Sequence, residues 1–324
     1  MPDASLPSYD QLPVRDGAPA GSSWGVWGEG DVFGCLNLLT AERVVEAARL
    51  VRTGRVFALN FDAELPSPPL FGRAAPQHTV TGEPGAAGHD DVLTFNTQSS
   101  SQWDGFRHVG GPFGHYNGVY DEEHGIHHWA RRGIAGRAVV ADVGRWRERQ
   151  GRPFAYDTAD AIEPDEVRAT LDDQGVEVHP GDVLLLRTGW VGWYRSLDED
   201  ARAHLAEHLA APGLRAGEAT ARFLWDLHIA AIGADNPAVE VWPPGAHLTR
   251  EERAEARTDP SRMIDVFVHT SLLPLLGLPL GELWDLEAVA ADCAGDGVYE
   301  CFFTSAPLNV RAGVASPPNA LAIK

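Results

Sequence analysis

Polar and titratable side chains are concentrated in the stretch TQSSSQWDGFRHVGGPFGHYNG, residues 97 to 118. Asp104 and His108 lie four residues apart around a glycine, so a turn there can bring both side chains into one pocket. A carboxylate can bind a divalent cation, and an imidazole can act as a ligand or as a general base near neutral pH. If the preceding chain is extended, Gln98, Gln102 and Asp104 project from one face, because residues two apart share a face. The alternative is a surface loop held by its own hydrogen bonds.

A second pair of candidates lies far downstream, where polar side chains interrupt apolar sequence. His269 is in DVFVHTSLLPLLG, and Glu282 follows GLPLG. A buried carboxylate needs a hydrogen-bond donor or a cation, because an unpaired buried charge is costly. We therefore predict a pair in which Glu282 orients and polarises the imidazole of His269. The simpler alternative is that His269 is a core histidine whose hydrogen bonds are satisfied locally.

Motifs elsewhere in the chain are weaker candidates. His204 and His208 have the spacing of two ligands on one helical face, but the glutamate of an HExxH zinc motif is missing. The chain has neither a GxGxxG fingerprint with its acidic partner nor a GxxxxGK[ST] loop, which argues against nucleotide binding. No cysteine lies in a recognisable nucleophile motif.

Predicted helices and strands alternate around these candidates. AERVVEAARLV, EPDEVRATLDDQG and GEATARFLWDLH are predicted helices, and AGRAVVADV, DVLLLRTG and IAAIGAD are predicted buried strands. Residues 62 to 90 and 236 to 262 show little periodicity, so we expect long loops there. Few helices and long loops favour an α/β domain with a mixed sheet over a regular doubly wound sheet. Residues 1 to 23 are predicted to form an extended arm, which could pack on a partner subunit, and residues 24 to 324 a single domain.

Composition limits the partners that we expect. The formal net charge of −20 argues against a nucleic acid or an anionic membrane surface, so a small-molecule substrate is the expected partner. The N-terminus lacks the basic and apolar regions of a signal peptide, and no apolar run is long enough to span a bilayer. Three widely spaced cysteines are typical of reduced thiols, so we predict a cytoplasmic location.

Several long segments resemble, in the same order, one protein family. They include WGVWGEGDVFGCLNLLT, GRVFALN, SQWDGFRH, GIAGRAVVADV, GDVLLLRTGW, HTSLLPLLGLPLGELWDLE and FFTSAPLNVRAGVASPPNALAI. The chain resembles the cyclase family whose better-known relatives are bacterial kynurenine formamidase and isatin hydrolase, in the branch that carries SQWDGxRH. The resemblance implies an α/β, swivelling β/β/α cyclase-like fold, assembled as a homodimer or homotetramer.

The resemblance also implies a metal site, with one departure. Formamidase-like members carry HxGTHxDxPxH, in which two leading histidines and the aspartate bind zinc or manganese and the last histidine is catalytic. The aligned residues here are Gln98, Gln102, Asp104 and His108, of which Asp104 would also serve in catalysis. An amide oxygen is a weaker ligand than imidazole for zinc and suits a harder cation better. The expected cofactor is therefore a divalent metal (manganese, zinc or magnesium), and a site without metal is the alternative.

Three functions follow from this resemblance, which assigns the family's downstream His and Glu to His269 and Glu282. With a metal, the expected reaction is hydrolysis of a cyclic or aromatic amide or lactone by activated water. His108 would take the proton from that water, and His269 would protonate the leaving group or stabilise the oxyanion. Trp103 and Phe106 are expected to contact the substrate. Without a metal, proton transfer by the same residues would permit cyclisation or isomerisation of a natural-product scaffold, and a non-catalytic ligand-binding relative is the third alternative.

Overall fold

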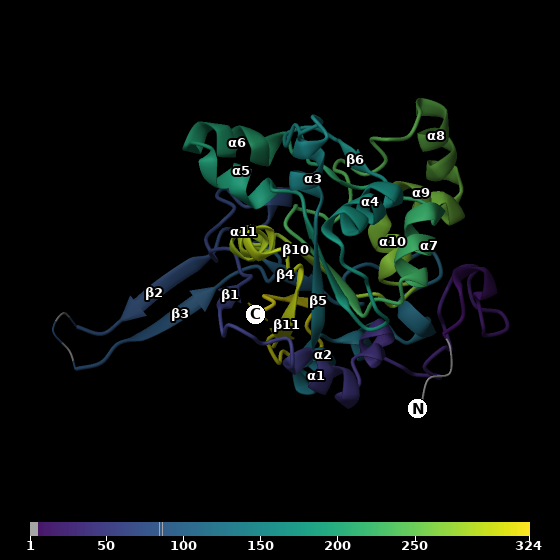
Figure 1. The fold of residues 1–324 in the computed structure, drawn as a ribbon, viewed down its shortest axis with the longest axis horizontal. Coiled ribbons are helices and arrows are strands. Elements are labelled where there is room, and N and C mark those ends of the chain that lie inside the picture. The colour runs from purple at the N-terminus through teal and green to yellow at the C-terminus, as the bar shows by residue number, and fades with distance from the viewer. Residues whose placement is uncertain (1–5, 84, 86) are drawn as a thin grey trace.

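A nine-stranded mixed sheet runs through the part of the chain that the computed structural model describes, residues 6–83, 85 and 87–324 (Figure 1). Its order is β1–β13–β11–β5–β7–β9–β10–β4–β12. β5, β7, β9 and β10 run parallel, and the strands on either side of them are antiparallel. The α/β class with a mixed sheet is therefore confirmed. The strands of this sheet are β1 (Val56–Ala58), β4 (Gln102–Asp104), β5 (Ile134–Asp142), β7 (Val183–Arg187), β9 (Ala231–Ala234), β10 (Leu280–Glu282), β11 (Glu300–Ser305), β12 (Ala315–Ser316) and β13 (Ala320–Ile323).

Apolar residues on both faces bury the parallel strands in the centre of the sheet. VLLLR in β7 and AIGA in β9 are almost entirely buried, which is the pattern expected where helices or loops cover both faces. α1 packs against β5 and β11, and α4 and α11 pack against β5. The α-helices are α1 (Ala41–Ala48), α2 (His127–Arg132), α3 (Val143–Arg149), α4 (Pro164–Gln174), α5 (Trp190–Ser196), α6 (Glu199–Glu207), α7 (Glu218–Asp226), α8 (Arg250–Thr258), α9 (Met263–Val266), α10 (Val268–Leu272) and α11 (Glu287–Asp296). Among the described residues, none of these helices has both the length and the apolar composition needed to cross a bilayer.

The expectation of long loops at residues 62–90 and 236–262 is wrong at two places. In the first segment, β2 (Gln77–Thr81) is a strand, and it pairs with β3 (Asp90–Thr94), which the segment DVLTFNT predicts as a strand. The two form an antiparallel hairpin that projects from the body (Figure 1), and all of their residues are exposed. In the second segment, α8 is a short, highly charged helix. β2 has no buried residue, and alanine is the only apolar residue type in α8, so the apolar periodicity that identifies core elements is missing. A small separate ladder joins β6 (Ala161–Ile162) to β8 (Gly213–Leu214).

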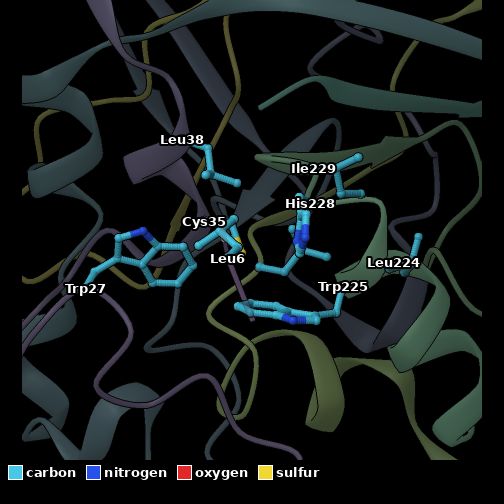
Figure 2. Close-up of a pocket in the computed structure, with 9 residues that line it drawn as sticks. Leu6, Trp27, Cys35, Leu38, Leu224, Trp225, His228 and Ile229 are labelled. Carbon is cyan, nitrogen blue, oxygen red and sulfur yellow. The ribbon is translucent and has the colours of Figure 1, made fainter. Parts of the chain in front are cut away.

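The described part of the predicted N-terminal arm, residues 6–23, packs on its own chain, while residues 1–5 lie outside the described residues. The indole N–H of Trp225 in α7 donates to the backbone oxygen of Pro7 at 2.8 Å. Leu6 and Trp225 are among the side chains that line an apolar cavity between the arm and α7 (Figure 2). Burial of these apolar side chains ties the arm to the domain.

Trp284 holds β10 in place beside its two neighbouring strands. Its ring lies against the backbone of Gly233 in β9 and Gly281 in β10, where an added Cβ would come within 2.6 Å of ring atoms. The indole N–H donates to the backbone oxygen of Gln102 in β4 at 3.0 Å. The fully buried ring also lies edge-on to Trp103, with the ring centroids 4.7 Å apart. Glycine is needed at both positions because the indole fills the space of a side chain.

Gly281→Ala is expected to lower the free energy of unfolding by about 1–3 kcal/mol, because the added methyl group collides with Trp284 in a packed core. Gly295→Ala is the matched control, since Gly295 lies in α11 with no neighbouring atom within 4 Å of an added Cβ. The control is expected to raise the free energy of unfolding by up to about 1 kcal/mol, because alanine favours a helix. Urea denaturation followed by tryptophan fluorescence measures both changes, and effects of the same sign would contradict this account.

Candidate active site

Three of the predicted site residues lie on one face of two paired strands. In the antiparallel pairing of β10 with β4, Glu282 lies opposite Gln102 and Leu280 lies opposite Asp104. Side chains alternate along a strand and paired residues share a face, so Gln102, Asp104 and Glu282 project to the same side. All three side chains are buried, and the side-chain N–H of Gln102 donates to a carboxylate oxygen of Glu282.

His108 reaches this face from the turn that follows β4. The backbone N–H of Gly105 donates to the oxygen of Val314 at 3.1 Å, and an added Cβ at residue 105 would lie 2.7 Å from that oxygen. Glycine is therefore required at position 105, where the strand ends. The N–H of His108 then donates to the backbone oxygen of Gly105 at 2.8 Å and closes the turn. The turn keeps the imidazole of His108 close to the carboxylate of Asp104.

His269 lies in α10 with both ring nitrogens facing carboxylates. Nδ1 is 2.8 Å from Oε2 of Glu240, and Nε2 is 3.0 Å from Oε1 of Glu282 and 3.5 Å from Oδ2 of Asp104. The ring centroids of His269 and His108 are 5.9 Å apart. The structure thus brings two segments that are more than 100 residues apart in the sequence into one buried cluster of carboxylates and imidazoles.

Burial and neighbouring charges set the protonation of this cluster. Burial alone would lower the pKa of His269, but Glu240 and the other carboxylates outweigh it and raise that pKa well above its usual value. Burial lowers the pKa of His108, and the charge of Asp104 offsets this only in part. Burial and the charge of Asp104 raise the pKa of Glu282, whereas the two imidazoles outweigh burial and lower the pKa of Asp104. The carboxylates therefore favour the protonated form of His269, whereas burial favours the neutral form of His108.

Gln98 and Gln102 both turn side-chain amides toward Asp104. Nε2 of Gln98 lies 2.6 Å from Oδ1 of Asp104 and 3.1 Å from Nδ1 of His108. Nε2 of Gln102 lies 3.4 Å from Oδ2 of Asp104. The expected extended row is wrong, because β4 begins only at Gln102 and residue 98 lies in a turn. The amide of Gln98 nevertheless reaches the same carboxylate from that turn.

Glu240 is a site residue that the sequence analysis did not identify. It is fully buried, and both carboxylate oxygens lie within 2.9 Å of Nδ1 of His269. It follows Val239, whose φ of 59° is unusual for a β-branched residue and redirects the chain. The only signal in the sequence is a carboxylate inside the apolar segment PAVEVW, the same kind of signal that singled out Glu282.

Trp103 and Phe106, which were expected to contact a substrate, lie in the core. Trp103 projects from β4 to the face opposite Asp104 and packs edge-on to Trp129 and Trp284. Phe106 packs edge-on to Trp129, with the ring centroids 5.1 Å apart. Neither ring has exposed surface, so neither offers a contact to a substrate. For Trp103 the correction follows from alternation, because a residue next to a site residue in a strand lies on the other face, whereas Phe106 lies in the turn after β4.

The cluster contains enough ligand atoms for one divalent cation. Asp104, His108 and His269 each offer one atom, and these atoms lie within 4.8 Å of one another. His269 is the least suitable of the three, because a metal-binding imidazole needs a free lone pair and both of its nitrogens face carboxylates. Half a turn of either amide would instead present an oxygen of Gln98 or Gln102 to a cation beside Asp104. This oxygen-rich set fits a hard divalent cation such as manganese or magnesium.

Comparison with known proteins places this fold and site in a family. Residues 38–241 match the family model described as "Putative cyclase". A solved structure described as a novel cyclase is 32% identical and has a TM-score of 0.78, over 94% of this chain and 99% of its own. The chain therefore belongs to this cyclase family, which confirms the resemblance. No curated protein sequence gives a significant match.

Isatin hydrolases share the fold at lower identity. Isatin hydrolase A from Labrenzia aggregata is 15% identical with a TM-score of 0.57, over 87% of this chain and 97% of its own. The enzyme of the same name from Ralstonia solanacearum is 16% identical with a TM-score of 0.55, over 88% and 98%. The structural similarity to these two enzymes supports the cyclase-like fold.

Glu240→Ala is expected to lower the free energy of unfolding by about 1–3 kcal/mol, because the buried Nδ1–H of His269 loses its acceptor. Glu240→Gln is expected to cost less, since the amide oxygen can still accept that hydrogen bond. Glu207→Ala at the exposed end of α6 is the control and is expected to stay within about 0.5 kcal/mol of the wild type. Chemical denaturation checks these values, and an Ala variant as stable as the control would disprove the role given to Glu240.

Asp104→Asn is expected to weaken binding of Mn²⁺ at least about tenfold, because the carboxylate common to both possible ligand sets loses its charge. Isothermal titration of metal-free protein with MnCl₂ measures the affinity without any substrate. Asp172→Asn, on the exposed side of α4, is the matched control and is expected to bind like the wild type. Equal affinities for wild type and Asp104→Asn would place any cation elsewhere.

Proposed function

We propose that the protein is a hydrolase that cleaves a cyclic or aromatic amide or lactone by attack of an activated water. The observation that carries the proposal is the pair of imidazoles, His108 and His269, with ring centroids 5.9 Å apart in a buried cluster of carboxylates. A carbonyl group placed beside the pair would have both a proton acceptor and a proton donor on the same side of the site. Isatin hydrolases, which share the fold, are named for a cyclic amide, and this supports the substrate class by analogy.

The two imidazoles take opposite roles in this reaction. As the water oxygen bonds to the carbonyl carbon, His108 accepts a proton from the water. The Nδ1–H of His269 stays bound to Glu240, while its Nε2–H leaves Glu282 for the oxyanion that forms. The Nε2 proton passes to the leaving nitrogen or oxygen when the bond to the carbonyl carbon breaks, and the contact with Glu240 keeps the ring in one orientation during the transfer. The products are a carboxylic acid, which releases its proton to solvent, and an amine or alcohol. The proton on His108 returns to His269 through solvent.

A divalent cation would be held by Asp104 together with the side-chain oxygens of Gln98 and Gln102. When bound, such a cation lowers the pKa of a coordinated water and polarises the carbonyl. Asp104 lies between the two amides and within reach of both imidazoles, so it holds the reacting groups together with or without the cation.

Metal-independent cyclisation or isomerisation is the second candidate. The amide nitrogens of Gln98 and Gln102 donate to Asp104 and Glu282, so these carboxylates find donors without a cation. In that case, His108 would remove a proton from a carbon next to a carbonyl, and the carboxylic acid or imidazolium groups would return it at another atom.

Labelled water separates the two candidates. The wild-type protein is incubated in H₂¹⁸O with a panel of cyclic aryl amides and lactones, including isatin. The masses of the products are then measured by mass spectrometry. Hydrolysis is expected to place one ¹⁸O atom in the new carboxylate. A cyclised or isomerised product without the label would favour the second candidate.

His108→Gln is expected to lower kcat/KM for ring opening by about 10²–10⁴, because the proton acceptor for water is lost while the shape of the side chain is largely kept. The assay follows the product carboxylate by liquid chromatography at a fixed metal concentration. His204→Gln, on the exposed face of α6, is the matched control and is expected to keep wild-type turnover. Full turnover by the His108 variant would exclude both catalytic proposals.

A further inference from the structure

Arg73 is a half-buried cation at the site that the proposed mechanism does not use. Its Nη1 donates to the backbone oxygen of Gln98 and lies 3.4 Å from Oε1 of Gln102. Its guanidinium carbon lies 4.7 Å from the centroid of the Phe71 ring. These contacts fix the guanidinium at the side of the cluster formed by the two glutamines, and its charge acts on Asp104.

Among the described residues, the guanidinium of Arg73 finds partners for only one of its nitrogen atoms. Within the described part of the chain, it forms no ion pair with a carboxylate, and its hydrogen bonds all come from Nη1. Other partly buried arginines behave differently, since Arg107 pairs with Asp121 and Arg187 pairs with Asp142. A guanidinium has five N–H donors in a planar fork that matches a carboxylate. The unused part of the fork is therefore suited to an anionic group of a ligand.

Half-exposed aromatic rings lie beside the same residues. Phe71 lies edge-on to Trp242, with ring centroids 4.8 Å apart, and Trp242 is two residues from Glu240. The φ of Phe71 is 60°, a conformation that a non-glycine residue keeps only where its surroundings hold it. Phe267 stacks on His269, with ring centroids 4.4 Å apart. These rings offer apolar surface to a planar ligand next to the site.

We propose that the substrate carries a carboxylate on a planar ring system, with the carboxylate bound by Arg73 and the ring packed against Phe71 and Trp242. This inference rests on the proposed function, which identifies the bond that is cleaved. It adds that the substrate carries a negative charge. The protein carries a net charge of −20, so a carboxylate gains no general attraction to its surface. The positive charge of the guanidinium therefore favours binding of an anion beside the cluster.

Two probes of nearly equal shape separate charge from size. Isatin-5-carboxylate and isatin-5-carboxamide are titrated into the protein by calorimetry. The wild type is expected to bind the carboxylate at least about tenfold more tightly than the carboxamide, and Arg73→Gln is expected to reduce this ratio to about one. Arg73→Lys is expected to retain part of the preference, because a point charge remains without the planar fork.

Arg49→Gln is the matched control, because Arg49 is exposed at the end of α1 and is expected to leave the ratio unchanged. Equal binding of both probes by the wild type, no binding of the carboxylate, or an unchanged ratio in Arg73→Gln would overturn the inference. If Arg73→Gln does not fold, Arg73→Lys is tested in its place. A ratio of carboxylate to carboxamide affinity equal to that of the wild type would then overturn the inference.

Failure of this inference can be told apart from failure of the proposed function. His108→Gln is expected to keep the binding ratio while turnover is lost. If the wild type prefers the carboxylate probe but opens neither ring, recognition by Arg73 stands and the proposed hydrolysis fails for this ring class. If the wild type opens both rings but binds the two probes equally, hydrolysis stands and the recognition by Arg73 is refuted.

Discussion

The antiparallel pairing of β10 with β4 is the constraint on which the site depends. It places Glu282 opposite Gln102, and alternation puts Asp104 on the same face. A slip by one residue would turn side chains of the site into the apolar face that Trp103 occupies. Trp284 opposes such a slip, because its indole fills the space above two glycines and its N–H binds the backbone oxygen of Gln102. The apolar face of the sheet thus fixes the register, while the polar face carries the chemistry.

The three buried carboxyl groups of the site determine how the imidazoles and amides around them are arranged. Asp104, Glu240 and Glu282 are buried together, and burial and the charge of Asp104 raise the pKa of both glutamates. His269 offsets part of this charge because it lies between the three carboxylates. The two glutamines supply N–H donors where formamidase-like relatives have imidazoles. A neutral amide can turn either its N–H or its oxygen inward, so the same side chains suit a protonated site or a cation-bound one.

The sequence predicts the parts of this structure that are local or that interrupt an apolar pattern. A glycine turn joins Asp104 to His108, and His269 and Glu282 are polar residues in apolar segments. Glu240 has the same signal, but its contact spans 29 residues and depends on a backbone turn that no periodicity encodes. The tryptophan beside Asp104 was given the wrong face because adjacency in sequence is not adjacency in a strand. Likewise, long buried strands follow from continuous apolar runs, whereas the exposed strand β2 has no buried face to reveal it.

The two imidazoles differ in how they are held, and this difference suits the separate roles proposed for them. His269 is bound at both nitrogens by carboxylates, so its ring cannot turn without breaking buried ion pairs. His108 lies on a turn, and its ring contacts the amide of Gln98, a neutral partner that is easily exchanged. Transfer of a proton from water to a leaving atom needs a donor of fixed direction and an acceptor that can change partners. Arg73 adds a positive charge at the edge of the cluster. Its guanidinium bonds to oxygens of the two glutamines and not to Asp104, Glu240 or Glu282.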